Sequence, residues 1–369
     1  MKKNSKAERE RQKLYRKELK MRQENVLRKF VQIMADEKKT ANATSDKSDK
    51  IEEIEDFSGF IEEESTVAGR VMSDLMYSFT TDLAIGKKIK SGELRKKVVN
   101  VEAEWKAPDG YHMTHFDMEN FSMKLLTKAV NPCFDKVVLQ LHGGGYIAKI
   151  RNVYYNFAVY YCDAGNGISV LSPDYRVAPE DPYPAALEDA LASYQWLLNK
   201  GWKGEQIILA GDSAGGGLAM ALTMYLRDHD MPLPCGIVAM SPWADVTASG
   251  DSYRLNYELY PLFGNTKESM IYVNDYAGEH DKRDPYISPV FGSFEDFPPM
   301  LIQVGSTEML LSDSITAAGV ADSIGVEVRL SIYDDMFHVF QMSGMFLPES
   351  KKAWEEVGQF IQLLMNEKS

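Results

Sequence analysis

The segment Gly211–Gly215, of sequence GDSAG, restricts the possible folds of this chain more than any other segment. It follows the apolar run Ile207–Ala210 and precedes a helical run that starts near Gly216. A strand, a G-x-S-x-G turn and a helix in this order lift the serine hydroxyl clear of a sheet, and the glycines avoid side-chain clashes in so sharp a turn. The helix N-terminus also points backbone N–H groups at a developing anion. We therefore predict that Ser213 is a nucleophile; an ordinary glycine-rich turn is the alternative.

Short β-rich runs alternate with helical stretches from about residue 98 onward. The β-rich runs are 98–105, 121–127, 136–141, 168–172, 206–210, 236–240, 300–304 and 326–332, and the helical stretches are 184–199, 213–228, 311–324 and 351–366. Strands that alternate with helices over this length predict an α/β fold with a mostly parallel central sheet flanked by helices on both faces. Apolar residues at helical spacing over 57–90 predict one or two further helices that cover part of the domain.

Three consecutive glycines follow the β-rich run 136–141, in the tetrapeptide His142-Gly143-Gly144-Gly145. Glycines leave backbone amides unshielded, and such amides can stabilise the tetrahedral oxyanion of acyl transfer. We predict that the N–H groups of Gly143 and Gly144, together with that of Ala214, form an oxyanion hole. By itself the tetrapeptide could also be a flexible loop.

A serine hydroxyl needs a general base because it is a poor nucleophile near neutral pH. Two histidines follow Ser213 beyond its own helix, His280 and His338. His280 lies in a charged run typical of a surface, whereas His338 follows the last predicted strand, in a loop that can reach the carboxyl edge of the sheet. We therefore predict that His338 is the base.

The base needs a carboxylate that orients it and stabilises its imidazolium form. Glu308 lies in the loop just beyond the predicted strand 300–304, and Asp313 follows five residues later. We predict Glu308, because Asp313 falls in the first turn of the next helix, where it could simply favour the helix dipole. Asp313 remains the alternative acid.

The net charge, the cysteines and the apolar segments indicate the class of partner and the compartment of the protein. A formal net charge of -13 argues against nucleic-acid binding. Cys133, Cys162 and Cys235 are too widely spaced for a disulfide framework or a zinc site, which favours free thiols in a reducing compartment. No apolar signal segment and no apolar run of about 18 residues occur, so we expect a cytoplasmic protein without a membrane span.

The N-terminal part differs in composition from the rest. The first 30 residues carry 12 Lys or Arg against 4 Glu. We predict three parts: a charged helical extension over 1–40, a linker and helical cap over 41–97, and a catalytic domain over 98–369. The extension either contacts an anionic surface or a partner, or is a solvated terminal helix.

Together these residues resemble the hormone-sensitive-lipase-like (family IV) esterases of the α/β-hydrolase superfamily. The matching segments are HGGGY at 142–146, DYRVAPE at 174–180, YPAALEDA at 183–190, GDSAGGGLA at 211–219, SPWAD at 241–245, SPV at 288–290, PPMLIQVGSTEMLLSD at 298–313 and FHVF at 337–340. The resemblance spans roughly residues 98–365. It implies the α/β-hydrolase fold, a Ser-acid-His triad under an N-terminal helical cap, activity on short- to medium-chain acyl esters, and a possible homodimer.

The resemblance assigns roles position by position. Ser213 matches the nucleophile and His338 the base, while Glu308 stands where the family usually has Asp, and Phe337 where a proline is common. Glu180 falls in a segment that supports the wall of the active site, and Asp245 is either similar or a cap of a turn.

The implied reaction is acyl transfer through an acyl-enzyme, with a small-molecule acyl ester as substrate and no metal or organic cofactor. An amidase, deacetylase or acyltransferase with the same triad is the alternative within enzymes. A ligand-binding protein on the hydrolase scaffold is the alternative outside them, although the complete set of triad residues argues against it.

Two other features carry weaker indications. His112 and His115 are spaced as a metal pair, but they lie between predicted strands without a third ligand, so we predict no metal site. The tyrosine-rich segment 153–161 could line a pocket, although its helical spacing is more typical of core packing.

Overall fold

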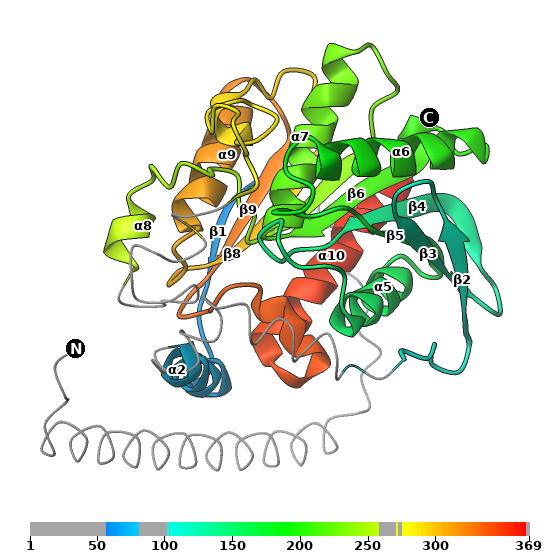
Figure 1. Ribbon diagram of the computed structural model, residues 1–369. Helices are drawn as coiled ribbons and strands as arrows, with labels where there is room; N and C mark the ends of the chain where they lie inside the picture. Colours follow the sequence, from blue (N-terminus) through cyan, green and yellow to red (C-terminus); the bar gives the residue numbers. More distant parts are fainter. Residues whose placement is uncertain (1–56, 81–101, 103, 258–270, 272–274, 367–369) are drawn as a thin grey trace, which may run out of the picture.

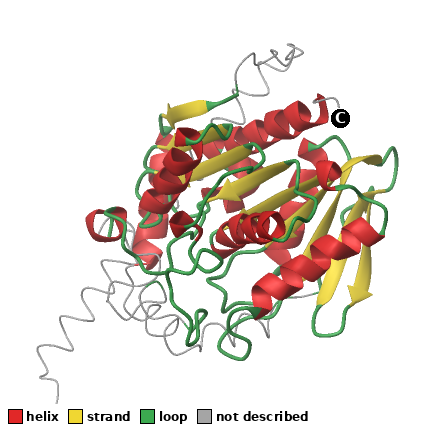
Figure 2. Ribbon diagram, turned by 90° about the horizontal axis from the view of Figure 1, so that it is seen from above, coloured by secondary structure: helices red, strands yellow, loops and turns green. Residues whose placement is uncertain are grey.

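The computed structural model describes residues 57–80, 102, 104–257, 271 and 275–366. In these residues a nine-stranded sheet crosses the molecule, and helices lie against both of its faces (Figures 1 and 2). The strands are β1 (Gly59–Glu63), β2 (Tyr111–Asp117), β3 (Ser122–Lys128), β4 (Cys133–Leu141), β5 (Ile168–Asp174), β6 (Ile207–Asp212), β7 (Gly236–Met240), β8 (Met300–Gly305) and β9 (Val328–Tyr333). The α/β class predicted from the sequence, with a mostly parallel central sheet flanked by helices on both faces, is confirmed.

The helices follow the strands in the alternating order that the sequence predicts. They are α2 (Val67–Thr80), α5 (Asn152–Ala164), α6 (Ala185–Asn199), α7 (Ala214–Asp228), α8 (Ser252–Leu255), α9 (Leu311–Ser323) and α10 (Pro348–Asn366), with short 3-10 turns η1 (Gly204–Gln206), η2 (Pro289–Phe291) and η3 (Phe340–Phe346). The helix α5 was not predicted as an element, although its tyrosines had the helical spacing noted above.

The sheet has the strand order β1-β9-β8-β7-β6-β4-β5-β3-β2. All neighbouring strands are parallel except the pairs β2–β3 and β3–β5, which are antiparallel. The five consecutive strands β4, β6, β7, β8 and β9 therefore release their following loops at one edge. In open parallel sheets this carboxyl edge is where ligands bind.

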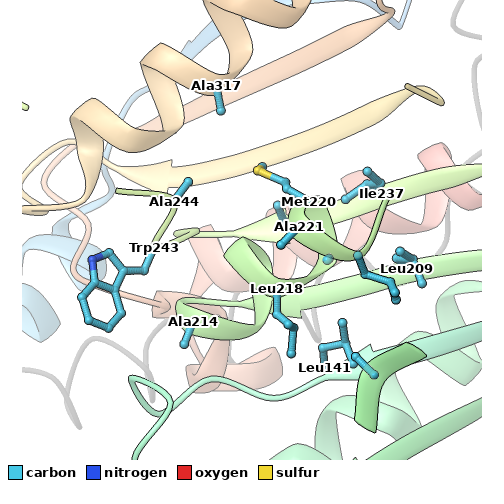
Figure 3. Packing of buried hydrophobic residues seen from close by; sticks show 14 of the residues in the cluster. Leu141, Leu209, Ala214, Leu218, Met220, Ala221, Ile237, Trp243, Ala244 and Ala317 are labelled. Atoms are coloured by element: carbon cyan, nitrogen blue, oxygen red, sulfur yellow. The ribbon is translucent and has the colours of Figure 1, made fainter. Parts of the chain in front are cut away.

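The central strands are apolar on both sides because both faces of the sheet are covered. In β4, Val137 and Leu139 pack into the core with α6, α7 and α9, whereas Val138 packs into the second core with α5 and α10. Figure 3 shows part of the first of these cores, where side chains of α7 such as Leu218 pack against Leu141 and Leu209 on one face of the sheet. Burying one such side chain contributes roughly 1.5–3 kcal/mol, so these two cores hold the strand ends in fixed positions.

The structure corrects two assignments. The prediction of helix from residue 57 onward is wrong for residues 59–63. These residues form β1, which pairs in parallel with β9 at the edge of the sheet. His112 and His115 do not lie between strands but on β2. Residues 102, 104 and 105 of the predicted first strand are irregular, and its other residues lie outside the described part.

Most of the predicted extension and cap, residues 1–56 and 81–101, also lies outside the described residues, so these domain limits stay predictions. None of the helices described is both long and apolar enough to cross a bilayer. The three cysteines are free thiols, and only Cys162 is buried.

Candidate active site

Ser213 occupies a strained turn between β6 and α7. Its φ of 51° and ψ of −121° lie outside the ordinary regions for a residue with a side chain. Such strain persists where the surrounding structure enforces it, and it is typical of functional sites. The hydrogen bonds from Ser213 N to Met240 O (2.9 Å) and from Trp243 N to Ser213 O (2.7 Å) tie the turn to the end of β7. The nucleophile predicted from the sequence therefore stands at the carboxyl edge of the sheet.

The glycines on either side of the serine are required by close backbone contacts. A Cβ atom on Gly211 would lie 2.3 Å from Gly215 O, and one on Gly215 would lie 2.0 Å from Leu141 O. Both neighbours are backbone atoms, which cannot rotate away. These contacts bring the end of β4, and hence the glycine loop that follows it, directly against the turn that carries Ser213.

His338 and Glu308 meet at the same edge. His338 Nδ1 lies 2.6 Å from Glu308 Oε2, and the two side chains are only 8% and 1% exposed. Glu308 follows β8, and His338 follows β9, so adjacent parallel strands deliver the two groups. A buried carboxylate at this distance fixes the imidazole tautomer with the proton on Nδ1 and stabilises the protonated ring.

Ser241 holds the second carboxylate oxygen, a contact that the sequence did not suggest. Ser241 Oγ donates to Glu308 Oε1 at 2.7 Å, and Gly305 N donates to the same oxygen at 2.6 Å. Ser241 Oγ also accepts from Val339 N at 3.1 Å, next to His338 in the chain. One buried hydroxyl thus connects the carboxylate to the loop that carries the histidine.

Asp313, the alternative acid, is engaged elsewhere. Its Oδ2 accepts hydrogen bonds from the backbone amides of Ala244 (2.9 Å) and Asp245 (2.8 Å) and from the hydroxyl of Tyr253 (3.0 Å). Burial, and next the charge of Asp245, raises the pKa of Asp313 well above its ordinary value. Its contacts hold the loop after β7, and it is Glu308 that contacts the His338 ring.

The glycine loop after β4 contains two of the three predicted oxyanion donors. The amide of Gly143, predicted as an oxyanion donor, donates to Asp212 Oδ1 at 3.0 Å and is therefore committed to that carboxylate. Gly144 has a φ of +116°, which only glycine adopts without strain. Ala214 is the first residue of α7, where N–H groups have no partner within the helix. The oxyanion role of Gly143, Gly144 and Ala214 stays a prediction.

His142, at the start of the glycine loop, is a structural histidine. Its ring stacks on Tyr175 with centroids 4.0 Å apart, and its carbonyl oxygen accepts a hydrogen bond from the Tyr175 hydroxyl at 2.5 Å. Complete burial lowers the pKa of His142 to about 4, so the ring is neutral near neutral pH. The Nδ1 atom lies 2.8 Å from Gly143 O, which holds the loop at its first residue.

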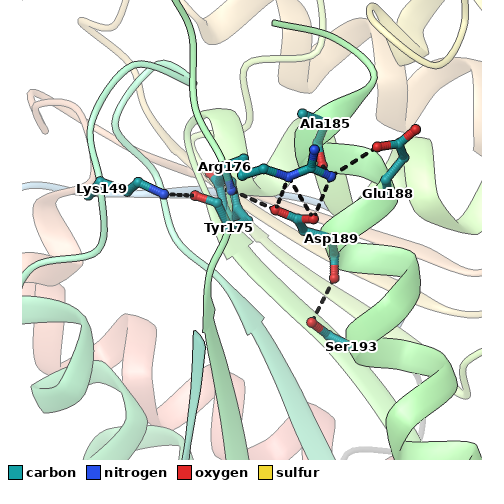
Figure 4. Close-up of polar contacts among 7 residues, drawn as sticks. All are labelled: Lys149, Tyr175, Arg176, Ala185, Glu188, Asp189 and Ser193. Carbon is teal, nitrogen blue, oxygen red and sulfur yellow. Dashed lines mark hydrogen bonds and ion pairs between the residues drawn. The ribbon is translucent and has the colours of Figure 1, made fainter. Parts of the chain in front are cut away.

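A partly buried ion pair supports the segment after β5, which forms the wall beside this loop (Figure 4). The Arg176 guanidinium contacts Asp189 at 2.8 Å and Glu188 at 2.9 Å, and the Arg176 amide donates to Asp189 Oδ2 at 2.8 Å. Lys149 also donates to the backbone oxygen of Tyr175 at 3.1 Å, linking this wall to the segment after the glycine loop.

The remaining sequence candidates have structural roles or none. Asp245 caps a turn, since its carboxylate accepts from Thr247 N at 2.8 Å and from Ser249 N at 2.9 Å. Glu180 and His280 are exposed. In the described residues no group of three His, Cys, Asp or Glu side chains is arranged to hold a metal. The tyrosine-rich helix α5 packs into the core mainly through Tyr154 and Tyr161.

Comparisons with known proteins agree with the fold described above. The model of a family described as having the alpha/beta hydrolase fold matches residues 138–342, more than half of the chain. An acetyl-hydrolase of Streptomyces hygroscopicus is 37% identical over 232 residues, which are 63% of this chain and 77% of that protein.

Solved structures of esterases are also similar to this chain. One is an esterase from the bacterial hormone-sensitive lipase family, 31% identical with a TM-score of 0.66, covering 76% of this chain and 98% of that chain. Another is EstE5 soaked with p-nitrophenyl butyrate, 33% identical with a TM-score of 0.68, covering 77% of this chain and 98% of that chain. The likeness therefore extends to both sequence and fold.

Proposed function

This chain belongs to the α/β-hydrolase family and is an ester hydrolase of the hormone-sensitive-lipase-like group, and on that premise we propose that Ser213, His338 and Glu308 form its catalytic triad. The observation that carries the proposal is the buried 2.6 Å contact between His338 Nδ1 and Glu308 Oε2. It lies at the same sheet edge as the strained Ser213 turn, and each residue follows a parallel strand.

In the proposed reaction Ser213 Oγ attacks the ester carbonyl while His338 Nε2 takes its proton. Glu308 stabilises the imidazolium that forms, and the amides of Gly144 and Ala214 bind the oxyanion. The C–O bond to the leaving group then breaks, the alcohol departs with the proton from His338, and an acyl-Ser213 ester remains. Water deprotonated by His338 attacks this ester, which frees the carboxylic acid and restores the serine.

We further propose that the substrates are esters of short- to medium-chain acids. Two similar proteins support a short acyl group, since one is named an acetyl-hydrolase and the other was soaked with a butyrate ester.

The test is hydrolysis of p-nitrophenyl esters from acetate to palmitate by wild type, Ser213→Ala and His338→Ala. We expect turnover that peaks at acetate to octanoate and losses on the order of 10³-fold or more in both variants, as for members of other triads. Ser193→Ala is a matched control, because that buried serine bonds only within α6, to Asp189 O at 2.7 Å.

Full activity of Ser213→Ala would remove the assignment of the nucleophile. Wild-type turnover of p-nitroanilides with none of the esters would move the reaction class to an amidase. In each case the folded state of the variants is checked by circular dichroism, so that lost activity is not confused with lost structure.

A further inference from the structure

A buried carboxylate next to the nucleophile has no part in the reaction above. Asp212 immediately precedes Ser213 and is only 3% exposed. Its Oδ1 accepts the amide proton of Gly143 at 3.0 Å, and its Oδ2 accepts a hydrogen bond from the Tyr154 hydroxyl at 3.3 Å. A Cβ atom on Gly143 would lie 2.2 Å from Oδ2, so the glycine loop and the carboxylate are in direct contact.

This placement of a carboxylate is energetically costly. Burial, the largest influence, raises the pKa of Asp212 to about 7, and the nearby His338 is the first of the influences that lower it. Burying a polar group without full compensation is unfavourable. An apolar side chain at position 212 would be enough to pack the glycine loop against the turn. The carboxylate of Asp212 must therefore do something that packing alone does not require.

The residues that follow Gly143 and Asp212 in the chain explain why a hydrogen-bond acceptor is needed here. Gly143 is adjacent to Gly144, and Asp212 lies two residues before Ala214. The bond from Gly143 N to Asp212 Oδ1 therefore joins two backbone segments at points one and two residues away from the proposed oxyanion donors. The loop and the turn follow the neighbouring strands β4 and β6, which are paired as far as Leu141 and Gly211, and this bond joins the two segments beyond the end of that pairing.

We propose that Asp212 is a positioning residue, which fixes the glycine loop to the nucleophile turn so that the amides of Gly144 and Ala214 converge on one oxyanion. This inference rests on the proposed function of the same site. Tyr154 from α5 donates a longer hydrogen bond, of 3.3 Å, to the second carboxylate oxygen. The stacked pair of His142 and Tyr175 secures the other side of the loop.

The magnitude follows from the geometry of oxyanion stabilisation. One donor is worth about 10²–10³-fold in kcat, and a misplacement of about 1 Å can cost about 10²-fold. Asp212→Ala removes the acceptor and releases the loop, so we expect kcat to fall about 10²-fold while KM stays within about threefold. Asp212→Asn keeps a neutral acceptor, and since charge-assisted hydrogen bonds are roughly twice as strong, we expect a loss of about five- to tenfold.

The experiment measures kcat and KM with p-nitrophenyl butyrate for wild type, both Asp212 variants and Tyr154→Phe. It also measures the inhibition constant of an alkyl trifluoromethyl ketone, which forms a tetrahedral adduct with an active serine. In Asp212→Ala this constant should rise by the same factor as kcat/KM falls, because both depend on the oxyanion. Tyr154→Phe, which leaves the bond to Gly143 in place, should lose less than about threefold.

The outcomes separate this inference from the proposed function. Absence of ester turnover in wild type, or turnover that survives in Ser213→Ala, would overturn the function itself. Normal wild-type activity, with kcat and the inhibition constant unchanged in Asp212→Ala, would overturn only the role of Asp212. A lower unfolding midpoint with unchanged kcat would also overturn it, because that is the pattern of a purely structural group. If the alanine variant does not fold, Asp212→Leu, which refills the volume without an acceptor, replaces it.

Discussion

Replacing Ser241 by alanine tests how the carboxylate of Glu308 is held. Ser241 Oγ donates to Glu308 Oε1 at 2.7 Å and accepts from Val339 N at 3.1 Å, and the side chain is fully buried. The substitution removes both hydrogen bonds at once without adding any atom. It leaves the carboxylate with Gly305 N as its remaining donor at Oε1.

The expected loss of stability can be worked out from these contacts. A hydrogen bond to a charged group contributes about 1.5–3 kcal/mol, and a buried N–H left without an acceptor costs about 1–3 kcal/mol. Ser241→Ala removes the hydroxyl and loses both contributions at once. We therefore expect it to lower the free energy of unfolding by roughly 3–5 kcal/mol. We also expect kcat to fall about tenfold, because a carboxylate that loses one anchor orients His338 less well.

A second substitution at the same position separates strain from hydrogen bonding. Ser241 has a φ of 47°, and a side chain at positive φ costs about 1 kcal/mol relative to glycine. Ser241→Gly loses the same hydrogen bonds but relieves this strain. It should therefore be about 1 kcal/mol more stable than Ser241→Ala, the opposite of the usual order of these two residues.

Urea unfolding followed by tryptophan fluorescence gives the stabilities, and hydrolysis of p-nitrophenyl butyrate gives kcat. The matched control is Ser331→Ala, because Ser331 is equally buried and donates to another buried carboxylate, Glu356 Oε1, at 2.6 Å. The control should lose stability but keep kcat. The reasoning is refuted if Ser241→Ala retains wild-type stability and kcat, or if Ser331→Ala loses as much kcat as Ser241→Ala.

Three further predictions use other parts of the structure. Glu308→Ala should lower kcat by about 10²-fold or more, whereas Asp313→Asn should lower the unfolding midpoint and keep kcat; the reverse pattern would make Asp313 the acid. Gly215→Ala places a Cβ atom 2.0 Å from Leu141 O, so we expect little folded protein by circular dichroism, and a folded, active variant would contradict the turn geometry. The pKa of His142 is lowered by burial to about 4, so its contribution to stability is present above about pH 6.5 and lost as the pH falls towards 4. Wild type should therefore lose on the order of 2 kcal/mol more than His142→Gln between pH 7 and 5, and equal losses in urea titrations would argue against a neutral buried ring.

The central sheet could be predicted from the sequence because its strands are buried on both faces and read as short apolar runs. The edge strands could not. In β1 the pattern is half buried, with Phe60 exposed and Ile61 partly buried, and five residues are too few to distinguish a period of two from a helical period. In β2 His115 interrupts the alternation of apolar and polar residues. Pairing decides both assignments: β1 pairs with the remote strand β9, and β2 pairs with the next strand in the chain, β3.

The order of motifs along the chain also placed Ser213, Glu308 and His338 after three different strands, and the structure brings Glu308 and His338 together at the carboxyl edge of the sheet. The contacts of Asp212 and Ser241 were not foreseen, because each joins segments far apart in the sequence. Gly143 and Asp212 are 69 positions apart, and Ser241 and Val339 are 98 apart. For the same reason the sequence did not show that the Gly143 amide donates to Asp212 in the folded loop.

The pairing of β1 with β9 has a consequence for how the chain is made. Their partnered residues Gly59 and Arg329 lie about 270 positions apart. At a synthesis rate of roughly 5–20 residues per second, β1 leaves the ribosome on the order of 10–50 seconds before its partner exists. During that interval β1 has no ladder to join, and afterwards it shields the exposed backbone of β9 from pairing with another chain. A shortened chain that begins after residue 63 should fold its centre but present a bare strand edge, and its yield should fall through aggregation.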